Sequence, residues 1–298
     1  MNEPKPVAVV TGASTGIGED CVRALIAAGF FVFGSVRKDA DAVQLRKRFG
    51  ENFAPLFFDV TAREAIAFAV EKVEAHLAGR KLAGLVNNAG VALSGPLLHQ
   101  PIEEFKQQFE VNLFGQLNVV QAFAPLLGAD PARQGRPGRI VNMSSVAGTL
   151  AMPYVGAYGA SKHALEGFSD ALRRELMIFG VDVIVVQPGV IKTPIWDKAD
   201  RTDISRYDAT IFGPGMRRLR KWAMERGANG APPEWVSKAV VRALTTASPP
   251  ARIRVVPNYL FDWALPRLLP TRLLDFIVAK KLGLLPAATA EEDKNPSP

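Results

Sequence analysis

The chain reads VAVV at residues 7–10 and TGASTGIG at residues 11–18, and apolar residues at helical spacing follow at 21–28. A strand, a glycine-rich turn and a helix in this order predict a binding site for the pyrophosphate of a dinucleotide. Glycines let the backbone turn sharply and approach the phosphates, and the helix N-terminus offers unpaired N–H groups and a partial positive charge. Glycine-rich turns also occur as plain connections, so the position between strand and helix is what favours a binding site. The Gly-Lys-Ser/Thr ending of a P-loop is absent.

Short apolar runs alternate with longer helical patterns through most of the chain. Seven runs predict strands, at 7–10, 30–36, 55–58, 84–86, 139–143, 181–186 and 252–256. Apolar residues at spacings of three and four predict helices at 21–28, 62–77, 103–127 and 158–179. The strand runs are continuously apolar, as in sheets that helices cover on both faces. We therefore expect an α/β fold, a Rossmann-type doubly wound parallel sheet of about seven strands with helices on both faces.

Composition excludes several other classes of protein. The 298 residues are 48% hydrophobic and 22% charged, which is typical of a globular protein and not of a disordered or collagen-like chain. The single cysteine, Cys21, excludes an internal disulfide and a cysteine-based zinc site. No histidine has a partner at ligand spacing, so no metal site is expected. We expect a cytoplasmic protein, because cysteine is scarce, no signal-peptide pattern is found and no apolar run approaches the roughly 20 residues of a spanning helix.

No repeat or linker divides the sequence, so we expect a single domain over residues 1–298. Residues 190–232 interrupt the alternation of strands and helices with aromatic and charged residues, and we predict a substrate lid inserted over the sheet edge. Residues 257–286 form an apolar and basic extension with four prolines. Residues 287–298 are small, polar or charged and predict a disordered tail.

The net charge of +7, from 36 basic and 29 acidic residues, is compatible with several partners. A nucleic-acid binder should gather its basic residues in one stripe with stacking aromatics. The sole dense basic cluster, at 217–222, falls in the predicted lid, so no nucleic-acid partner is expected. The extension at 257–286 could lie on a membrane surface, fold over the substrate pocket or form an oligomer interface. Its prolines argue against one long amphipathic helix, and peripheral membrane contact is the less favoured interpretation.

The residues at the end of the second predicted strand indicate whether the protein prefers NADP or NAD. An NAD site places a carboxylate there to bind the ribose hydroxyls, whereas this chain has Arg37 and Lys38. A guanidinium suits a 2′-phosphate and also stacks on adenine. The alternative is a solvated basic pair, and Asp39 is interpreted as the N-cap of the next helix. NADP is therefore the expected cofactor, with NAD as the second choice.

Tyr158 and Lys162 open the helical pattern at 158–179, and their spacing of four places both on one helical face. An ordinary tyrosine pKa of about 10 is too high for easy proton exchange at neutral pH, and a nearby ammonium lowers that pKa. On its own, a tyrosine and a lysine at this spacing would mostly be a chance occurrence and would not indicate a catalytic site. Ser145 follows the predicted strand at 139–143, which places it at the carboxyl edge of a parallel sheet, where ligands bind.

Together these stretches resemble the short-chain dehydrogenase/reductase family, and the matches follow the family order across most of the chain. They are the glycine loop at 11–18, Asp59-Val60, Asn87-Asn88-Ala89-Gly90, Asn112, Ser145, Tyr158, Lys162, and Pro188-Gly189 with Thr193. The glycine spacing and the chain length are similar to the compact branch of the family. The phrases at 32–37 (VFGSVR), 161–176 (SKHALEGFSDALRREL) and 187–194 (QPGVIKTP) resemble retinol and 17β-hydroxysteroid dehydrogenases most.

The resemblance implies hydride transfer between a nicotinamide cofactor and a substrate carbon. It implies that Tyr158 exchanges a proton with the substrate oxygen and that Ser145 hydrogen-bonds the same oxygen. It also implies that Lys162 binds the nicotinamide ribose and lowers the pKa of Tyr158, and that Asn112 holds a water on the proton path. The cofactor contacts that it implies are Gly12, Ser14, Thr15, Gly16, Ile17, Gly18, Arg37, Asp59, Val60, Asn88, Ala89, Gly90, Tyr158, Lys162, Pro188, Gly189 and Thr193.

Residues near the expected active site are largely apolar, and the predicted lid carries aromatic side chains. Apolar pockets with few polar groups are typical of ligand sites, so we expect a lipophilic alcohol, ketone or aldehyde, up to the size of a steroid or retinoid. Tyr154 and Trp196 are expected to contact the substrate, together with Ser145 and Tyr158. Trp196 could equally anchor the lid to the domain.

Two classes of function remain open from the sequence. One is the enzyme just described, and the other is a catalytically silent dinucleotide-binding sensor. A sensor that had lost catalysis should lack the tyrosine or the lysine, and both are present. The family resemblance also implies a homodimer or homotetramer, formed through the helices at 103–127 and 158–179.

Overall fold

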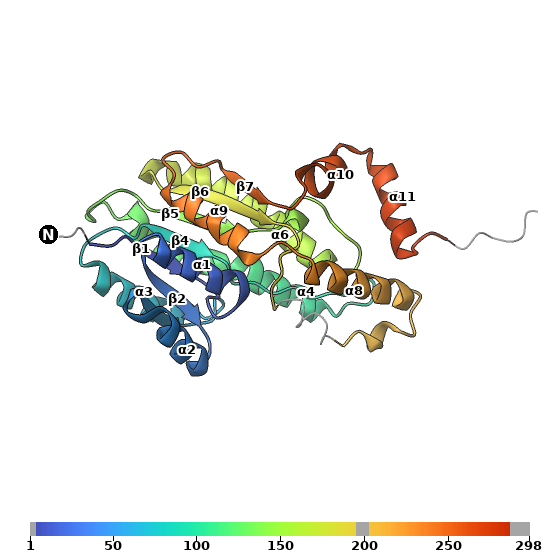
Figure 1. Cartoon of the computed structure of the whole chain (residues 1–298), viewed down its shortest axis with the longest axis horizontal. Helices are drawn as coiled ribbons and strands as arrows, with labels where there is room; N and C mark the ends of the chain where they lie inside the picture. The colour runs from blue at the N-terminus through green and yellow to red at the C-terminus, as the bar shows by residue number, and fades with distance from the viewer. Residues whose placement is uncertain (1–3, 195–202, 287–298) are drawn as a thin grey trace, which may run out of the picture.

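Seven parallel strands form one sheet in the computed structural model, which describes residues 4–194 and 203–286 (Figure 1). The strands are β1 (Val7–Val10), β2 (Phe31–Val36), β3 (Phe53–Phe57), β4 (Gly84–Asn87), β5 (Arg139–Met143), β6 (Asp182–Pro188) and β7 (Arg252–Val255). Their order in the sheet is β3-β2-β1-β4-β5-β6-β7. Every neighbouring pair is parallel, so all seven carboxyl ends lie at the same edge. The predicted doubly wound parallel sheet is confirmed.

Helices cover both faces of this sheet (Figure 1). The helices of the described residues are α1 (Gly16–Ala27), α2 (Asp39–Phe49), α3 (Arg63–Leu77), α4 (Ile102–Phe109), α5 (Gly115–Ala124), α6 (Gly156–Glu175), α8 (Gly213–Ala228), α9 (Pro233–Thr245), α10 (Leu265–Leu268) and α11 (Thr271–Leu282). Shorter turns join several of them and are named below where they matter.

The first strand illustrates why both faces need a cover. Successive side chains of a strand point to opposite faces. Ala8 and Val10 pack with α1, α2 and α9, whereas Val7 and Val9 pack with α3, α5 and α6. All four side chains are buried. Because neither face meets water, strands of this kind are apolar throughout, which explains the continuous apolar runs of the sequence.

Two predicted helices differ from the structure in a way that their backbone explains. The helix predicted at 103–127 is α4 and α5 joined by a π-helical turn, Glu110–Phe114, and it ends in a second such turn, Pro125–Ala129. The helix predicted at 158–179 begins two residues earlier, and its last turn, Leu176–Phe179, is a 3₁₀ turn. Apolar spacing does not distinguish these turns from α-helix, because all of them keep one side of the chain toward the core.

The predicted role of Asp39 as a helix cap is wrong. Lys38 is the N-cap of α2, with an extended backbone (φ −125°, ψ 139°), and Asp39 is the first residue of the helix. Asp39 and Asp41 therefore lie in the first turn. There a negative charge is favourable because it faces the positive end of the helix dipole.

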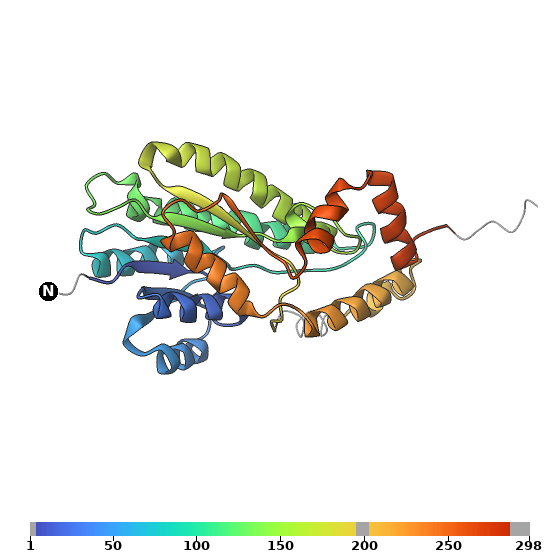
Figure 2. The same ribbon diagram turned by 45° about the horizontal axis from the view of Figure 1, so that its top comes forward.

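The predicted lid leaves the sheet and returns to it at one point. Lys192 N donates to Ala231 O (2.9 Å), and Ala231 N donates to Val190 O (2.9 Å), so the two ends of residues 190–232 are paired. Between these ends α8 projects beyond the carboxyl edge of the sheet (Figure 2). An apolar cluster separate from the two cores of the sheet packs against α8. Its buried members are Tyr154, Ile204, Tyr207, Met216, Leu219 and Leu282.

The C-terminal extension is divided into short helices, as its prolines predict. Pro266 lies in the first turn of α10, and Pro270 is the N-cap of α11. The end of α11 packs against α8, where Leu282 is buried and Arg218 Nη1 donates to Leu282 O (3.0 Å). The helices α8, α10 and α11 thus form one group, which we call the cap helices. The predicted tail at 287–298 lies outside the described residues.

Two further features were sought in residues 4–194 and 203–286. No helix there is both long enough and apolar enough to cross a bilayer. No group of three or more His, Cys, Asp or Glu side chains there is placed to hold a metal ion.

Gly215 allows α8 to lie directly on Tyr154. A Cβ atom at Gly215 would stand 2.0 Å from Tyr154 Oη and 2.8 Å from Tyr154 Cζ. Because the Tyr154 side chain is buried, we expect Gly215→Ala to lower the free energy of unfolding by about 1–3 kcal/mol, the usual cost of overpacking. Urea unfolding measures this change.

The matched control is Gly167→Ala in α6, where nothing lies within 4 Å of the added Cβ. Helix propensity favours alanine there by about 1 kcal/mol, so this variant should be at least as stable as the wild type. Equal stability of the two variants would contradict the packing of α8 on Tyr154.

Candidate active site

The glycine loop between β1 and α1 excludes side chains at three positions. Gly12 and Gly16 have φ values of +65° and +61°, in the left-handed region that glycine favours. A Cβ at Gly18 would stand 2.1 Å from Gly12 O and 2.5 Å from Asn88 Nδ2. Thr15 is the N-cap of α1, and its side chain makes no cap bond. The first-turn N–H groups of α1 therefore lie beside a bare backbone, which fits the pyrophosphate of a dinucleotide.

Thr11 fastens this loop to the end of β4. Its Oγ1 accepts hydrogen bonds from Asn88 N (2.9 Å) and Ala89 N (3.0 Å). In return, Asn88 Nδ2 donates to Thr11 O (2.9 Å) and Gly12 O (3.2 Å). Thr11 is buried, so its hydroxyl acts inside the protein. Thr11 was not among the predicted site residues, although its place between the strand and the first glycine could have indicated this role.

Asn112 extends the same connection to α6. It is fully buried in the π-helical turn between α4 and α5. Its Oδ1 accepts from Val91 N (2.9 Å), and its Nδ2 donates to Val91 O (3.0 Å) and Ser161 Oγ (3.1 Å). The Asn112 amide thus holds the segment after β4 against α6. Its role in holding a water stays a prediction.

Ser145, Tyr158 and Lys162 meet at the carboxyl end of β5. Ser145 precedes a 3₁₀ turn, where its Oγ accepts from Ala147 N (3.1 Å) and donates to Pro188 O (3.5 Å), and its hydroxyl lies near enough to Tyr158 to influence the pKa of that tyrosine. Lys162 Nζ lies 5.9 Å from the centroid of the Tyr158 ring and donates to Met143 O (2.7 Å). The structure therefore brings together the three residues that the sequence analysis grouped.

Removal from water shifts the pKa of both Tyr158 and Lys162. Burial raises the pKa of Tyr158 above its ordinary value, and the Ser145 hydroxyl opposes this rise. The pKa of Tyr158 is thus raised in the protein alone, whereas the resemblance implied a lowering by Lys162. Burial also lowers the pKa of Lys162 to about 8, and the charge of Glu166 opposes that fall.

Glu166 lies one turn after Lys162 on α6 and was not singled out from the sequence. It is 7% exposed. Its Oε1 accepts from Gln187 Nε2 (3.0 Å), and its Oε2 accepts from Arg252 Nε (2.9 Å). Arg252 also pairs with Asp170, at 2.9 Å. A buried, hydrogen-bonded carboxylate at this position favours the charged form of Lys162. The sequence could have indicated this role of Glu166, because it is an acidic residue on the core face of a helix, four positions after Lys162.

The opposite end of the expected cofactor path lies beside β2. Gly12 N donates to Ser35 Oγ (2.9 Å), which holds the glycine loop against this strand. Arg37 follows the strand with its side chain 71% exposed, and its Nη1 lies 3.2 Å from Asp59 Oδ2. Burial raises the pKa of Asp59, but hydrogen bonds from Thr61 and Arg37 hold that pKa below its ordinary value. Exposed ion pairs contribute about 0–1 kcal/mol, so Arg37 can rearrange toward an anionic ligand at little cost.

The remaining predicted cofactor residues lie along the same edge. A Cβ at Gly16 would stand 3.3 Å from Thr193 Cβ, so Thr193 lies close to the glycine loop. Gly189 N donates to Val255 O (2.9 Å) just after β6. The Val60 side chain is buried in the core, so only the backbone atoms of Val60 could contact a cofactor. The other predicted residues are Ser14 and Ile17 in the loop and first turn of α1, Ala89 and Gly90 after β4, and Pro188 at the end of β6.

Of the four predicted substrate residues, Ser145, Tyr154 and Tyr158 are described, and Tyr154 lies apart from the other two. Its backbone has φ +67°, and its carbonyl accepts from Gly95 N (2.7 Å). Its side chain is 4% exposed and packs with Tyr207 and Met216 against α8. The structure thus places Tyr154 in the packing of the cap, and a substrate contact stays a prediction. Trp196 lies outside the described residues.

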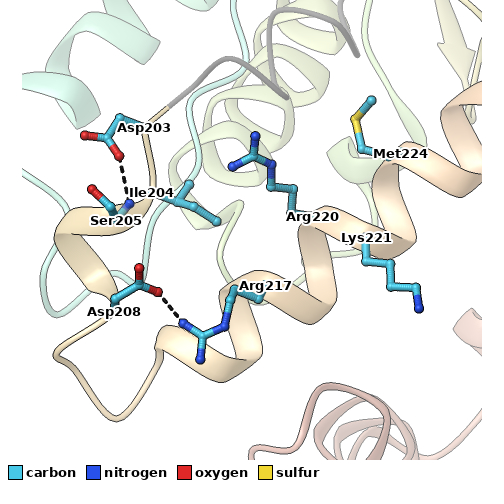
Figure 3. A pocket seen from close by; sticks show the side chains of 8 residues that line it. All are labelled: Asp203, Ile204, Ser205, Asp208, Arg217, Arg220, Lys221 and Met224. Carbon is cyan, nitrogen blue, oxygen red and sulfur yellow. Dashed lines mark hydrogen bonds and ion pairs between the residues drawn. The ribbon is translucent and has the colours of Figure 1, made fainter.

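A separate pocket lies between α8 and the 3₁₀ turn Ser205–Tyr207 (Figure 3). Arg217 pairs with Asp208 on its wall, and Ser205 N donates to Asp203 Oδ1 (2.8 Å). Its lining residues are Asp203, Ile204, Ser205, Asp208, Arg217, Arg220, Lys221 and Met224. Most of these side chains are polar or charged, and none of them belongs to the group around Tyr158. This pocket is therefore not the expected site for a lipophilic substrate.

Comparison with known proteins assigns the family. Residues 6–203 match the profile described as short chain dehydrogenase. The chain belongs to the short-chain dehydrogenase/reductase family. This short-chain dehydrogenase/reductase is an oxidoreductase whose chemistry depends on NAD or NADP, and its sheet order and glycine loop are those of the family's Rossmann fold.

Similar proteins from bacteria and mouse cover most of the chain. The NADPH-dependent 3-dehydrocapnine reductase of Ornithobacterium rhinotracheale is 42% identical, over 93% of this chain and 98% of that protein. The 3-ketodihydrosphingosine reductase of Bacteroides thetaiotaomicron is 31% identical, over 84% of this chain and 88% of that protein. Mouse estradiol 17-beta-dehydrogenase 2 is 33% identical, over 94% of this chain and 75% of that protein. The likeness to 17β-hydroxysteroid dehydrogenases is therefore weaker than the likeness to the Ornithobacterium reductase.

Glu166→Gln removes the negative charge that holds up the pKa of Lys162. We expect this pKa to fall below its wild-type value of about 8, because burial then acts with less opposition. The ammonium is present below its pKa and is lost as the pH rises through it. The alkaline fall of kcat/KM for carbonyl reduction should therefore begin at lower pH in the variant, and a pH series of kcat/KM measures it.

Glu103→Gln on α4 is the matched control, because its side chain is 75% exposed and pairs with Lys106. This variant should keep the wild-type pH profile. If the two variants gave the same profile, the electrostatic link between Glu166 and Lys162 would be wrong.

Proposed function

We propose that this protein is an NADP-preferring reductase of a ketone on a lipophilic molecule, with Tyr158 as the general acid. The observation that carries the proposal is the meeting of Ser145, Tyr158 and Lys162 at the edge of the sheet to which the glycine loop also belongs. A serine hydroxyl next to a tyrosine, with a buried ammonium close by, provides the groups needed to bind and protonate a carbonyl oxygen. The reverse reaction, oxidation of the alcohol, uses the same groups with Tyr158 as the base.

The residues of the glycine loop and of the strand ends would hold the cofactor. When bound, NADPH supplies the hydride that adds to the carbonyl carbon. Ser145 donates to the carbonyl oxygen and orients the substrate. The Tyr158 hydroxyl then gives its proton to that oxygen, so that ketone, hydride and proton together become the alcohol. Holding the reacting groups at fixed positions is the main contribution of the protein.

Lys162 is suited to a second task. Its ammonium is 4% exposed and lies on the same helical face as Tyr158. We assign it to the nicotinamide ribose and to stabilising the phenolate that Tyr158 leaves after proton transfer. Asn112 holds the neighbouring segment in place and, through a water, would continue the proton path to solvent.

The preference for NADP rests on Arg37. Its guanidinium follows β2 at the position where an NAD site has a carboxylate, and its exposed pairing with Asp59 leaves it available to a 2′-phosphate. The similarity to a reductase named as NADPH-dependent supports the same choice.

The choice of substrate class rests on the cap and on the relatives. The buried side chains under α8 are apolar or aromatic, which favours a lipophilic substrate at the adjoining edge of the sheet. Two similar proteins are named for the reduction of a 3-dehydro or 3-keto compound, and a third is named for the 17-beta position of estradiol. We therefore favour a ketone that becomes a secondary alcohol over an aldehyde.

The second candidate is a catalytically silent sensor of dinucleotides. In such a sensor the glycine loop would still bind the dinucleotide, but Tyr158 would have no catalytic role. The placement of Tyr158 with Ser145 and Lys162 argues against it, because a sensor could use Lys162 to bind the nicotinamide ribose but has no use for a proton donor beside it.

We also propose a homodimer or homotetramer formed through α4, α5 and α6. Several large apolar side chains on and beside these helices are exposed in the single chain, as expected of an unpaired interface. They are Phe114, Met177, Ile178 and Phe179.

Tyr158→Phe separates the enzyme from the sensor. Loss of the general acid should lower kcat for ketone reduction by about 10²–10⁴-fold, whereas NADPH binding should stay nearly unchanged. The assay is NADPH consumption by the purified protein against a panel of 3-keto long-chain amines, steroid ketones and retinal. Tyr259→Phe, at a tyrosine that is 52% exposed, is the control and should keep wild-type kcat. Substantial activity in Tyr158→Phe would refute the mechanism.

Arg37→Asp tests the cofactor preference. Loss of a charge-assisted hydrogen bond of about 1.5–3 kcal/mol should weaken NADPH binding by about ten- to a hundred-fold, while NADH binding improves. Fluorescence titration with both cofactors measures the change. Arg46→Asp, on the exposed surface of α2, alters the net charge equally and should leave both affinities close to wild type. Unchanged NADPH affinity in Arg37→Asp would show that a residue other than Arg37 binds the 2′-phosphate.

A further inference from the structure

The C-terminal helices expose two stripes of large apolar side chains. Along the π-helical turn Leu260–Ala264 and α10, the spacing of Phe261, Leu265 and Leu268 places them on one side of the helix. Along α11, Leu273, Phe276 and Ile277 share one side in the same way. These six side chains are between 38% and 77% exposed, and we call them the C-terminal patch. Apolar patches of this kind mark interaction sites.

The opposite sides of both helices are firmly attached to the protein. Trp263 lies between two arginines, with the guanidinium carbons of Arg254 and Arg267 at 4.0 Å and 4.5 Å from its ring centroid. Arg267 Nη2 donates to Val146 O (3.2 Å), one residue beyond Ser145. On α11, Leu282 is buried against α8. The patch is therefore the outer side of an attached element, held next to the candidate active site.

Figures 1 and 2 place α10 and α11 at the end of the molecule, beyond the carboxyl edge of the sheet. The outer sides of these helices face away from the two cores. No described element covers the six side chains enough to bury them.

The charges around the patch are mainly positive. Lys280 continues the stripe of α11 by one turn and Arg272 lies beside it, whereas the Lys281 ammonium lies over the ring of Trp222 on α8 (5.1 Å to the centroid). All three basic residues are exposed, and the Arg272 side chain is 98% exposed. Among residues 257–286 the acidic side chains are Asp262, which pairs with Arg226 (3.0 Å), and Asp275, which lies 4.0 Å from Arg272 in an exposed pair. An apolar stripe with basic residues at its border complements a surface that is apolar inside and negative outside.

We propose that the C-terminal patch docks on an anionic lipid surface. The apolar side chains would enter the boundary of the acyl chains, and the lysine and arginine heads would stay at the level of the headgroups. A second copy of the chain is a poorer occupant, because a two-fold contact would bring the same cations face to face. Docking would also set the carboxyl edge of the sheet toward the bilayer, where lipophilic molecules are concentrated. The proposal concerns the surface and does not depend on the identity of the substrate.

Co-sedimentation of the whole protein with vesicles tests the proposal, without cofactor or substrate. We expect binding to phosphatidylcholine vesicles that contain phosphatidylglycerol, weaker binding at high salt, and little binding to phosphatidylcholine alone. Leu268→Gln/Phe276→Gln removes two members of the patch and should weaken binding by at least about ten-fold. Lys280→Gln should weaken it by about five-fold, since a basic residue near an anionic surface contributes about 1 kcal/mol.

The matched control is Phe68→Gln on α3, where an equally large side chain is 70% exposed on another surface. This variant should bind like the wild type. Absence of vesicle binding by the wild-type protein would overturn the proposal, as would equal binding to both kinds of vesicle or an equal loss in Phe68→Gln. Analytical ultracentrifugation adds one more decisive outcome. If Leu268→Gln/Phe276→Gln dissociated an oligomer while vesicles bound no protein, the patch would be a contact between copies of the chain.

Discussion

The candidate active site depends on the parallel pairing of β1, β4 and β5. Val10 lies opposite Val86 in this register, so neighbouring strands end at the same level. Thr11, Asn88 and Ser145 follow three of these strand ends within two residues, although long stretches of sequence separate them. In an antiparallel sheet the ends of neighbouring strands would lie at opposite edges, and these residues could not meet. Helix N-termini and strand ends are therefore collected at one edge, where an anionic cofactor is favoured.

A buried positive charge organises the chemistry at this edge. The Lys162 ammonium is removed from water, which is tolerable only because Met143 O accepts its hydrogen bond and Glu166 lies one turn away. Gln187 on β6 and Arg252 on β7 donate hydrogen bonds to Glu166, so residues of two strands stabilise the negative charge on α6. The pKa of Lys162, about 8, is the outcome of burial against this negative charge. A distant strand therefore contributes to the protonation of a residue that the proposed reaction needs.

The cap helices have an apolar cluster of their own, separate from the two cores of the sheet. This cluster connects Tyr154, just before the start of α6, with α8 and with the end of α11. The helix α11, which completes this cluster, exposes part of the C-terminal patch on its outer side. One segment thus packs against α8 on one side and leaves apolar side chains exposed on the other, because a helix has two sides and only one is needed for packing.

The sequence by itself determined the sheet, the glycine loop and the group of Ser145, Tyr158 and Lys162. The sheet and the glycine loop depend on local features, namely continuous apolar strands and obligatory glycines, whereas the group of three was implied by the resemblance to the family. Only the tertiary structure decided the rest. The π-helical turn at Asn112 keeps the apolar side of an α-helix and so leaves no mark in the spacing. Glu166 and its partners come from α6, β6 and β7, and the pKa values of Tyr158 and Lys162 depend on burial that no short stretch of sequence encodes. Contacts between residues far apart in the chain are set by the packing of whole elements, which is why local patterns predicted the framework of the site and not its electrostatic environment.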